Sequence, residues 1–217
     1  CYENNAYKHI IKIDNDSYRN CLYRGCKTLL DFSLKKNIPF FPKFFSFLLH
    51  NFSEPIRTIN ALLGKEDFSY PATSKSHNFL IKKPNLIHAH NLYPNYFDFR
   101  SIKNLSLEYP LLITAHDCWL MTGHCAHPFE CIRFTKGCGA CPDLRIPPAI
   151  KRDRTKENLN LKVKIFSKSK VFLATPSRWL KEMFEKSKVG EFFEEIRVIP
   201  NGVDTDVFLP LRDQHEL

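Results

Sequence analysis

The fold class is decided by residues 84–90 (PNLIHAH) and 110–115 (PLLITA). Each predicts a strand, because a proline precedes a short run that is rich in apolar residues. The second run is almost continuously apolar, which is typical of a strand buried on both faces of a parallel sheet. Between the two runs a short helix is predicted by apolar residues at three-residue spacing, namely Tyr96, Phe99, Ile102 and Leu105. Strand, helix and strand within about 30 residues form a βαβ unit.

The same alternation returns after residue 155. Apolar residues at Leu159, Val163 and Phe166 predict a helix, and residues 170–175 (KVFLAT) predict a strand. Ser177 is a suitable N-cap for a further helix, whose apolar side would carry Trp179, Leu180, Met183 and Phe184. Residues 196–199 predict a last strand, closed by a Pro-Asn-Gly turn. The predicted fold is therefore α/β, with a Rossmann-like, doubly wound parallel sheet.

The composition excludes several classes of protein. The chain has 217 residues, of which 32 are Lys or Arg and 23 are Asp or Glu, and its net charge of +9 favours an anionic partner or surface. An apolar fraction of 43% is enough to build a core. No run reaches the roughly 20 apolar residues of a membrane-spanning helix, and the first residues do not follow the plan of a signal peptide. Neither G-x-G-x-x-G nor G-x4-G-K-[ST] is present, so no nucleotide is expected in a loop of that kind.

Polar residues follow the first two predicted strands. His88, His90 and Asn91 lie at the end of the first strand, and His116 and Asp117 follow the second. Ligands of open parallel sheets bind at the carboxyl ends of the strands, so these residues are candidates for a binding site. His116 is the strongest candidate, because an imidazole can hydrogen-bond a sugar hydroxyl or a phosphate oxygen and exchanges protons near neutral pH.

Two alternatives remain open for the histidines. Alternation along the first strand would turn His88 inward, as a hydrogen-bonded core residue. A metal-dependent hydrolase is a weaker alternative, in which the ligands would be His88, His90, His116 and Asp117. No H-E-x-x-H or similarly spaced ligand set supports that alternative.

An irregular Cys-rich loop lies between the two halves, at residues 122–148. It has no helix or strand period, and tetrahedral zinc coordination could order it. Two disulfides in an oxidising compartment, or reduced thiols, are the alternatives. Cys118 lies outside the spacing and is expected to be a small buried residue. The proposed metal ligands have the spacing C-x5-C-x6-C-x2-C and are Cys125, Cys131, Cys138 and Cys141.

Two basic segments could contact a membrane. Residues 151–170 carry eight Lys or Arg residues, which form either a solvated helix face or a surface for anionic lipid. Residues 35–52 combine six Phe with three Lys, which suits either a core or the membrane interface. Nucleic acid is not an expected partner, because aromatic residues are not interleaved with the first basic run.

The chain resembles the acceptor-side domain of family 4 glycosyltransferases, of the sort found in bacterial polysaccharide and lipopolysaccharide gene clusters. The resemblance covers residues 67–210. It rests on motifs that follow one another in order: FSYP (68–71), PNLIHAHNL (84–92), LITAHDCW (112–119), TGHC (122–125), GCGACP (137–142), TPSRWL (175–180), and IPNGVD (199–204) with VFLP (207–210).

The resemblance implies a GT-B enzyme, in which two Rossmann-like domains face each other across a cleft. Such enzymes retain the anomeric configuration and require no cofactor for catalysis. The implied partners are a nucleotide-sugar donor, held mainly by the C-terminal domain, and a glycan or lipid-linked acceptor. The family's histidine at the end of the strand before the acceptor loop maps onto His116, whose expected role is positioning and electrostatic stabilisation. The other expected substrate contacts are His90, Asn91, Asp117, Trp119 and His124.

The sequence departs from the family pattern at both ends. The family's first strand and its glycine-rich loop would precede Cys1, and the donor domain would follow Pro210. We therefore expect residues 1–210 to be a partial acceptor domain and residues 211–217 to begin a connection, with no turnover by this chain alone. The expected parent is a cytoplasmic hexosyltransferase that could associate peripherally with the inner membrane face. The alternative is a non-catalytic, zinc-stabilised module that binds an anionic glycan or lipid.

Overall fold

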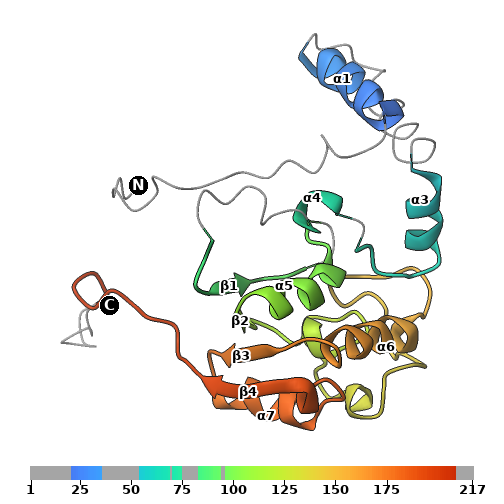
Figure 1. The fold of residues 1–217 in the computed structure, drawn as a ribbon. Helices are drawn as coiled ribbons and strands as arrows, with labels where there is room; N and C mark the ends of the chain where they lie inside the picture. The colour runs from blue at the N-terminus through green and yellow to red at the C-terminus, as the bar shows by residue number, and fades with distance from the viewer. Residues whose placement is uncertain (1–20, 36–53, 69, 75–82, 94–95, 209–217) are drawn as a thin grey trace, which may run out of the picture.

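The computed structural model describes residues 21–35, 54–68, 70–74, 83–93 and 96–208. Its centre is a parallel sheet of four strands in the order β1-β2-β3-β4 (Figure 1). The strands are β1 (Ile87–His90), β2 (Leu111–Thr114), β3 (Val171–Thr175) and β4 (Phe193–Val198). All three neighbouring pairs are parallel, and His90 is paired with Thr114. The predicted α/β parallel sheet is confirmed, and its described strands add in sequence order, in one direction.

Helices connect the successive strands. The short η4 (Phe99–Ser101) and α5 (Ile102–Glu108) lie between β1 and β2, and α6 (Thr155–Phe166) lies between β2 and β3. Between β3 and β4 lie α7 (Arg178–Lys186) and the short η7 (Gly190–Phe192). In the described part of the chain, β1 is preceded by α1 (Cys21–Lys35), α3 (Pro55–Leu62) and α4 (Pro71–Ser74).

The core lies between one face of the sheet and these connecting helices. Leu111 and Ile113 of β2 are buried in it, together with Ile102 of α5 and Leu159 of α6. Three aromatic rings pack edge to face in it, where Phe99 lies 5.5 Å from Trp119 and 5.4 Å from Phe166 between ring centroids. Edge-to-face contacts of this kind each contribute about 0.5–1.5 kcal/mol beyond the area that they bury.

The opposite face of the sheet is more open. Phe172 of β3 is 44% exposed, and Leu112 of β2 is only partly buried. His88 and His90 are exposed residues of β1, so His88 is not the core histidine that alternation allowed. The expectation that β2 is buried on both faces therefore holds fully only for its helix-covered face.

The N-cap prediction for α7 is confirmed. The Ser177 side chain accepts a hydrogen bond from the backbone N–H of Leu180 at 3.2 Å. Leu180 and Phe184 are buried one helical turn apart, as predicted. The prediction is wrong for Trp179. Its side chain is 47% exposed, because its position next to Leu180 faces away from the core.

Of the two basic segments, only residues 151–170 are described in full by the structure. Most basic residues of 151–170 are exposed, but Lys162 is completely buried and does not belong to a solvated face. Residues 36–52 of the Phe-rich segment lie outside the described residues. Among the helices that the structure describes, none is long and apolar enough to cross a membrane.

Candidate functional site

Two histidines meet where β1 and β2 end. His90 is the last residue of β1, and His116 follows the end of β2 by two residues, so the parallel register brings them together. Nδ1 of His90 lies 3.1 Å from Nε2 of His116, and the two exposed rings stack with centroids 5.4 Å apart. Such a bond needs one N–H and one lone pair, so it is lost if both rings carry a positive charge. The sequence predicted this neighbourhood correctly.

His88 completes the row of imidazoles on this edge. Its ring centroid lies 4.1 Å from that of His90, and its Nε2 lies 2.8 Å from Oγ1 of Thr114. Burial, followed by the positive charges of His88 and His116, lowers the pKa of His90 below its ordinary value of 6.5. His90 is therefore a neutral hydrogen-bonding group near neutral pH, beside an exposed His116.

Asp117 is held by groups of the protein itself. One of its carboxylate oxygens accepts a hydrogen bond from the Tyr93 hydroxyl, and the other accepts one from the backbone N–H of Trp119 at 2.8 Å. Burial, followed by the hydrogen bond to Asp117, raises the pKa of Tyr93 well above its usual value of 10. Both carboxylate oxygens are engaged, so Asp117 fixes the turn after β2. The substrate contact that the resemblance implied for Asp117 stays a prediction.

A small pocket lies beside these residues. It has a volume of about 10 Å³ and is lined by Asn91, Tyr93, His116 and Asp117, among others. A space of this size holds a water molecule but no sugar ring. Asn91 is exposed and has a φ of 48°, a left-handed conformation that asparagine tolerates better than most residues. The chain thus turns sharply out of β1 at the edge of the pocket.

Two other predicted substrate contacts are buried. Trp119 is 1% exposed, and its indole N–H donates to Glu66 in the protein interior. His124 is also 1% exposed, and its Nδ1 lies 3.0 Å from the carbonyl oxygen of Pro148. Trp119 nevertheless lines the small pocket beside His116, whereas His124 lines the cavity of the Cys-rich loop. Both substrate contacts stay predictions.

The sequence did not reveal the buried ion pair behind the site. Nζ of Lys162 lies 3.0 Å from Oε2 of Glu66, with 0% and 3% of the two side chains exposed. The same ammonium group donates to the carbonyl oxygens of Trp119 at 2.8 Å and Thr122 at 3.0 Å. Burial lowers the pKa of Lys162 and raises that of Glu66, and the attraction within the pair opposes both shifts. Lys162 thereby ties the segment after β2 to α6.

Local backbone geometry places Glu66 against Lys162. Gly64 ends the α3 turn with a φ of 76°, and a Cβ there would lie 1.9 Å from the carbonyl oxygen of Arg152, so only glycine fits. Asn158 of α6 donates to the carbonyl of Gly64 at 3.0 Å and accepts from the backbone N–H of Glu66 at 3.3 Å. The sequence does not predict the burial of Asn158, because its hydrogen-bond partners are more than 90 residues away.

The strand-end histidines do not form a metal site as they are placed. Across the described residues, no group of three or more His, Cys, Asp or Glu side chains is arranged to hold a metal ion. Nitrogens of His90 and His116 face each other, and Nε2 of His88 faces Thr114, so these atoms are already engaged. The arrangement gives the metal-dependent hydrolase alternative no ligand set.

A parallel α/β sheet with polar groups at its carboxyl edge defines a Rossmann-like domain. The chain matches the family described as Glycosyltransferase Family 4 over residues 38–207 and belongs to that family. Its sheet and flanking helices agree with half of a GT-B fold, as the resemblance implied.

A bacterial glycosyltransferase is similar to most of the chain. The chain is 28% identical over 178 residues to "Putative colanic acid biosynthesis glycosyl transferase WcaC" of Escherichia coli (strain K12). The match covers 77% of this chain and 38% of that protein, so the chain spans less than half the length of its relative. No solved structure matches the chain.

Proposed function

We propose that this chain is the acceptor-side part of a retaining glycosyltransferase, which moves a hexose from a nucleotide-sugar donor to a glycan or lipid-linked acceptor. Family membership supports the reaction class, and the name of the E. coli relative supports a polysaccharide product. The acceptor hydroxyl oxygen forms a bond to the anomeric carbon, the bond from that carbon to the diphosphate breaks, and the acceptor proton passes to the departing diphosphate. The donor diphosphate would be bound by a second domain.

One observation supports the roles that we assign to His116 and His90. In a chain of this family, the exposed His116 stands at the carboxyl edge of the sheet, hydrogen-bonded to His90 and beside the turn that Asp117 fixes. His116 hydrogen-bonds a hydroxyl of the acceptor or of the transferred sugar and stabilises charge that develops during transfer. His90 positions it. The reaction as proposed needs no catalytic metal.

The proposal includes action at the cytoplasmic face of the inner membrane, where a lipid-linked acceptor would lie. The net charge of +9 supports this location. Each basic residue close to an anionic membrane contributes about 1 kcal/mol of attraction. The exposed basic residues beside or on α6 are Lys151, Arg152, Lys156, Lys164, Lys168 and Lys170.

The test is sugar transfer by the intact protein with His116→Ala. Loss of one group that stabilises a transition state costs about 100-fold in kcat, and we expect a fall of that order with an unchanged melting temperature, because His116 is exposed. Asn104→Ala, an exposed and uncharged change on α5, is the control and should leave transfer unaffected. Unchanged transfer by His116→Ala would refute the assigned role. Glycan binding by the wild type without any transfer would instead support the non-catalytic module.

A further inference from the structure

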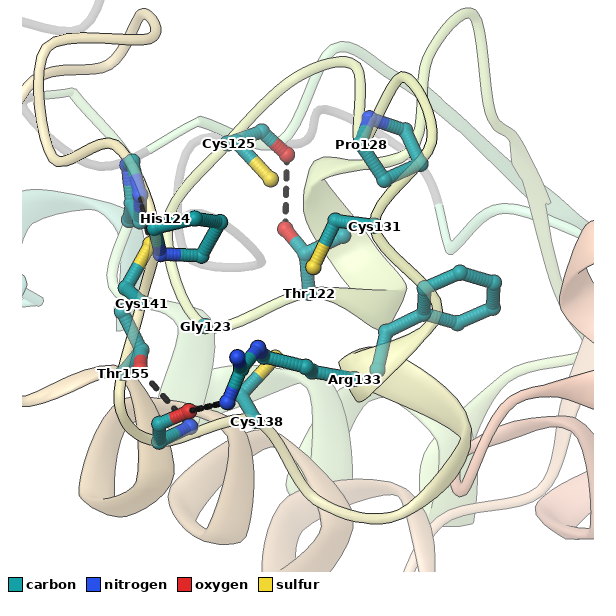
Figure 2. Close-up of a pocket in the computed structure, with 13 residues that line it drawn as sticks. Thr122, Gly123, His124, Cys125, Pro128, Cys131, Arg133, Cys138, Cys141 and Thr155 are labelled. Atoms are coloured by element: carbon teal, nitrogen blue, oxygen red, sulfur yellow. Dashed lines mark hydrogen bonds between the residues drawn. The ribbon is translucent and has the colours of Figure 1, made fainter.

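The four cysteines of the Cys-rich loop surround one small cavity. Cys125, Cys131, Cys138 and Cys141 all line it, and Figure 2 shows them around it together with His124. The cavity has a volume of about 20 Å³. This is room for one water molecule or one ion, and it is too small for a sugar or a nucleotide. The occupant of this site must therefore be very small.

The loop has little regular structure of its own to hold it in place. Within residues 122–148, all of which are described, the structure contains one short helix, η6 (Arg133–Thr135). Irregular segments of this length in a compact domain usually need a function or a stabilising element. A structural zinc ion supplies such an element, because its binding energy contributes directly to folding.

A left-handed stretch of backbone lies at the last pair of cysteines, Cys138 and Cys141. Residues 137–140 all have left-handed φ values, from 49° to 116°, and Cys138 and Ala140 hold this conformation without being glycine. Each such non-glycine residue costs about 1–2 kcal/mol and persists only where surrounding contacts impose it. The resulting turn brings both Cys138 and Cys141 to the cavity.

A histidine ring lies against one of the four sulfur atoms. The carbonyl oxygen of Pro148 can only accept, so Nδ1 of His124 carries the ring proton and Nε2 presents its lone pair 3.4 Å from the Cys141 sulfur.

We propose that Cys125, Cys131, Cys138 and Cys141 bind one structural zinc ion in the cavity that they line. Four thiolates fill the tetrahedral coordination of zinc, which leaves no open position for catalysis. As the side chains are placed, no three potential ligands of the described residues have metal-binding geometry, so the thiols must turn inward on binding, to about 2.3 Å from the ion. None of the five described cysteines from 118 onward is in a disulfide, so each of the four sulfurs can lose its proton and coordinate the ion.

A zinc ion at this place would support the carboxyl edge of the sheet. The loop carries His127, whose exposed ring stacks on Trp179 with centroids 5.2 Å apart and an interplanar angle of 9°. Trp179 belongs to α7, which starts just after β3. The ion thus fixes a loop that borders the proposed acceptor side, and its role is separate from that of His116.

The first experiment measures zinc in the intact protein, purified with a reductant and without chelators, by elemental analysis and native mass spectrometry. We expect one zinc per chain, released when a mercurial reagent modifies the thiols, and a tetrahedral thiolate spectrum after replacement by cobalt. A wild-type protein that contains no zinc and takes up none when zinc is added to its reduced form would overturn the proposal. A mass deficit of two hydrogens per disulfide without reductant, in zinc-free protein, would show disulfides instead.

Single variants identify the ligands. Cys131→Ser and Cys138→Ser should each reduce bound zinc at least tenfold, whereas Cys118→Ala, which removes a buried thiol outside the cavity, should retain one zinc. His124→Gln should also retain it, and loss of zinc there would overturn the four-cysteine ligand set. If a serine variant fails to fold, the cobalt spectrum of the wild type still decides, because its charge-transfer intensity reports the number of thiolate ligands.

Discussion

Lys162 and Glu66 form an ion pair across the back of the candidate site, with Nζ 3.0 Å from Oε2 and both side chains buried. The Lys162 ammonium also lies 3.7 Å from the centroid of the Trp119 ring. It therefore joins the segment after α3, the helix α6 and the turn after β2 through charge, backbone hydrogen bonds and an aromatic face. Lys162 thus holds the segment between His116 and the Cys-rich loop in place.

Lys162→Met should destabilise the intact protein strongly. The substitution keeps the volume but leaves Glu66 buried without its counter-charge, and breaking a buried pair in this way costs about 3–5 kcal/mol. We expect this loss in urea unfolding, measured from the midpoint and slope. The double variant with Glu66→Gln should recover part of it, because no charge is then left unpaired. Lys164→Met, exposed on the same helix, should stay within about 0.5 kcal/mol of the wild type. Equal losses for the two lysine variants would contradict the importance of the pair.

Most of the sheet could be predicted from the sequence, because its strands are short apolar runs between prolines and turn residues. Burial of Leu111 and Ile113 follows directly from the run at 110–115. The meeting of His90 and His116 could also be predicted, since the ends of parallel strands share one edge. Their hydrogen bond could not, because it depends on the register that pairs His90 with Thr114.

The sequence did not predict which polar residues lie in the interior. Lys162 stands in a run of basic residues and looks like part of a solvated face, yet it is buried because Glu66 reaches it from a segment 96 positions away. Trp119 and His124 lie close to His116 in sequence and resemble substrate contacts, but the turn after β2 directs both into the interior. Periodicity reports local faces of helices and strands, and it carries no information on such distant partners.

Acid should weaken the fold through His90. Its pKa is lowered in the native state, first by burial and then by His88 and His116, so the unfolded chain binds this proton more readily. Stability is therefore present above the ordinary pKa of about 6.5 and falls as the pH drops through that value. The measurement is the urea midpoint of the intact protein between pH 8 and pH 5, a range set about the ordinary histidine pKa.

His90→Gln isolates the contribution of this residue from that of the other histidines. The variant should show a flatter loss of stability with falling pH than the wild type, because the proton uptake on unfolding is removed. His127→Gln, on the Cys-rich loop and away from the histidine row, is the matched control and should keep the wild-type slope. Parallel pH profiles for the wild type and His90→Gln would show that protonation of His90 does not cause the loss of stability in acid.

Trp179 is expected to affect acceptor binding more than folding. Its ring is 47% exposed and stacks on His127 at the carboxyl edge of the sheet, on the same edge as His116. A stacking contact with an aromatic ring contributes about 0.5–1.5 kcal/mol, so Trp179→Ala should raise the KM for acceptor roughly twofold to tenfold. The kcat at saturating acceptor should change little, because the ring is not among the groups proposed to act on the reacting atoms. Steady-state kinetics with varied acceptor and saturating donor give both constants.

Phe172→Ala provides the comparison, because Phe172 is an aromatic residue of similar exposure, at 44%, on the open face of the sheet. It lies within β3 and not at its carboxyl end, so its removal should leave the KM for acceptor unchanged. Melting temperatures of both variants must stay close to the wild type for the kinetics to report binding. If both variants raise the KM equally, the effect comes from general loosening of the sheet. An unchanged KM in Trp179→Ala alone would mean that the acceptor does not extend over the loop side of the edge.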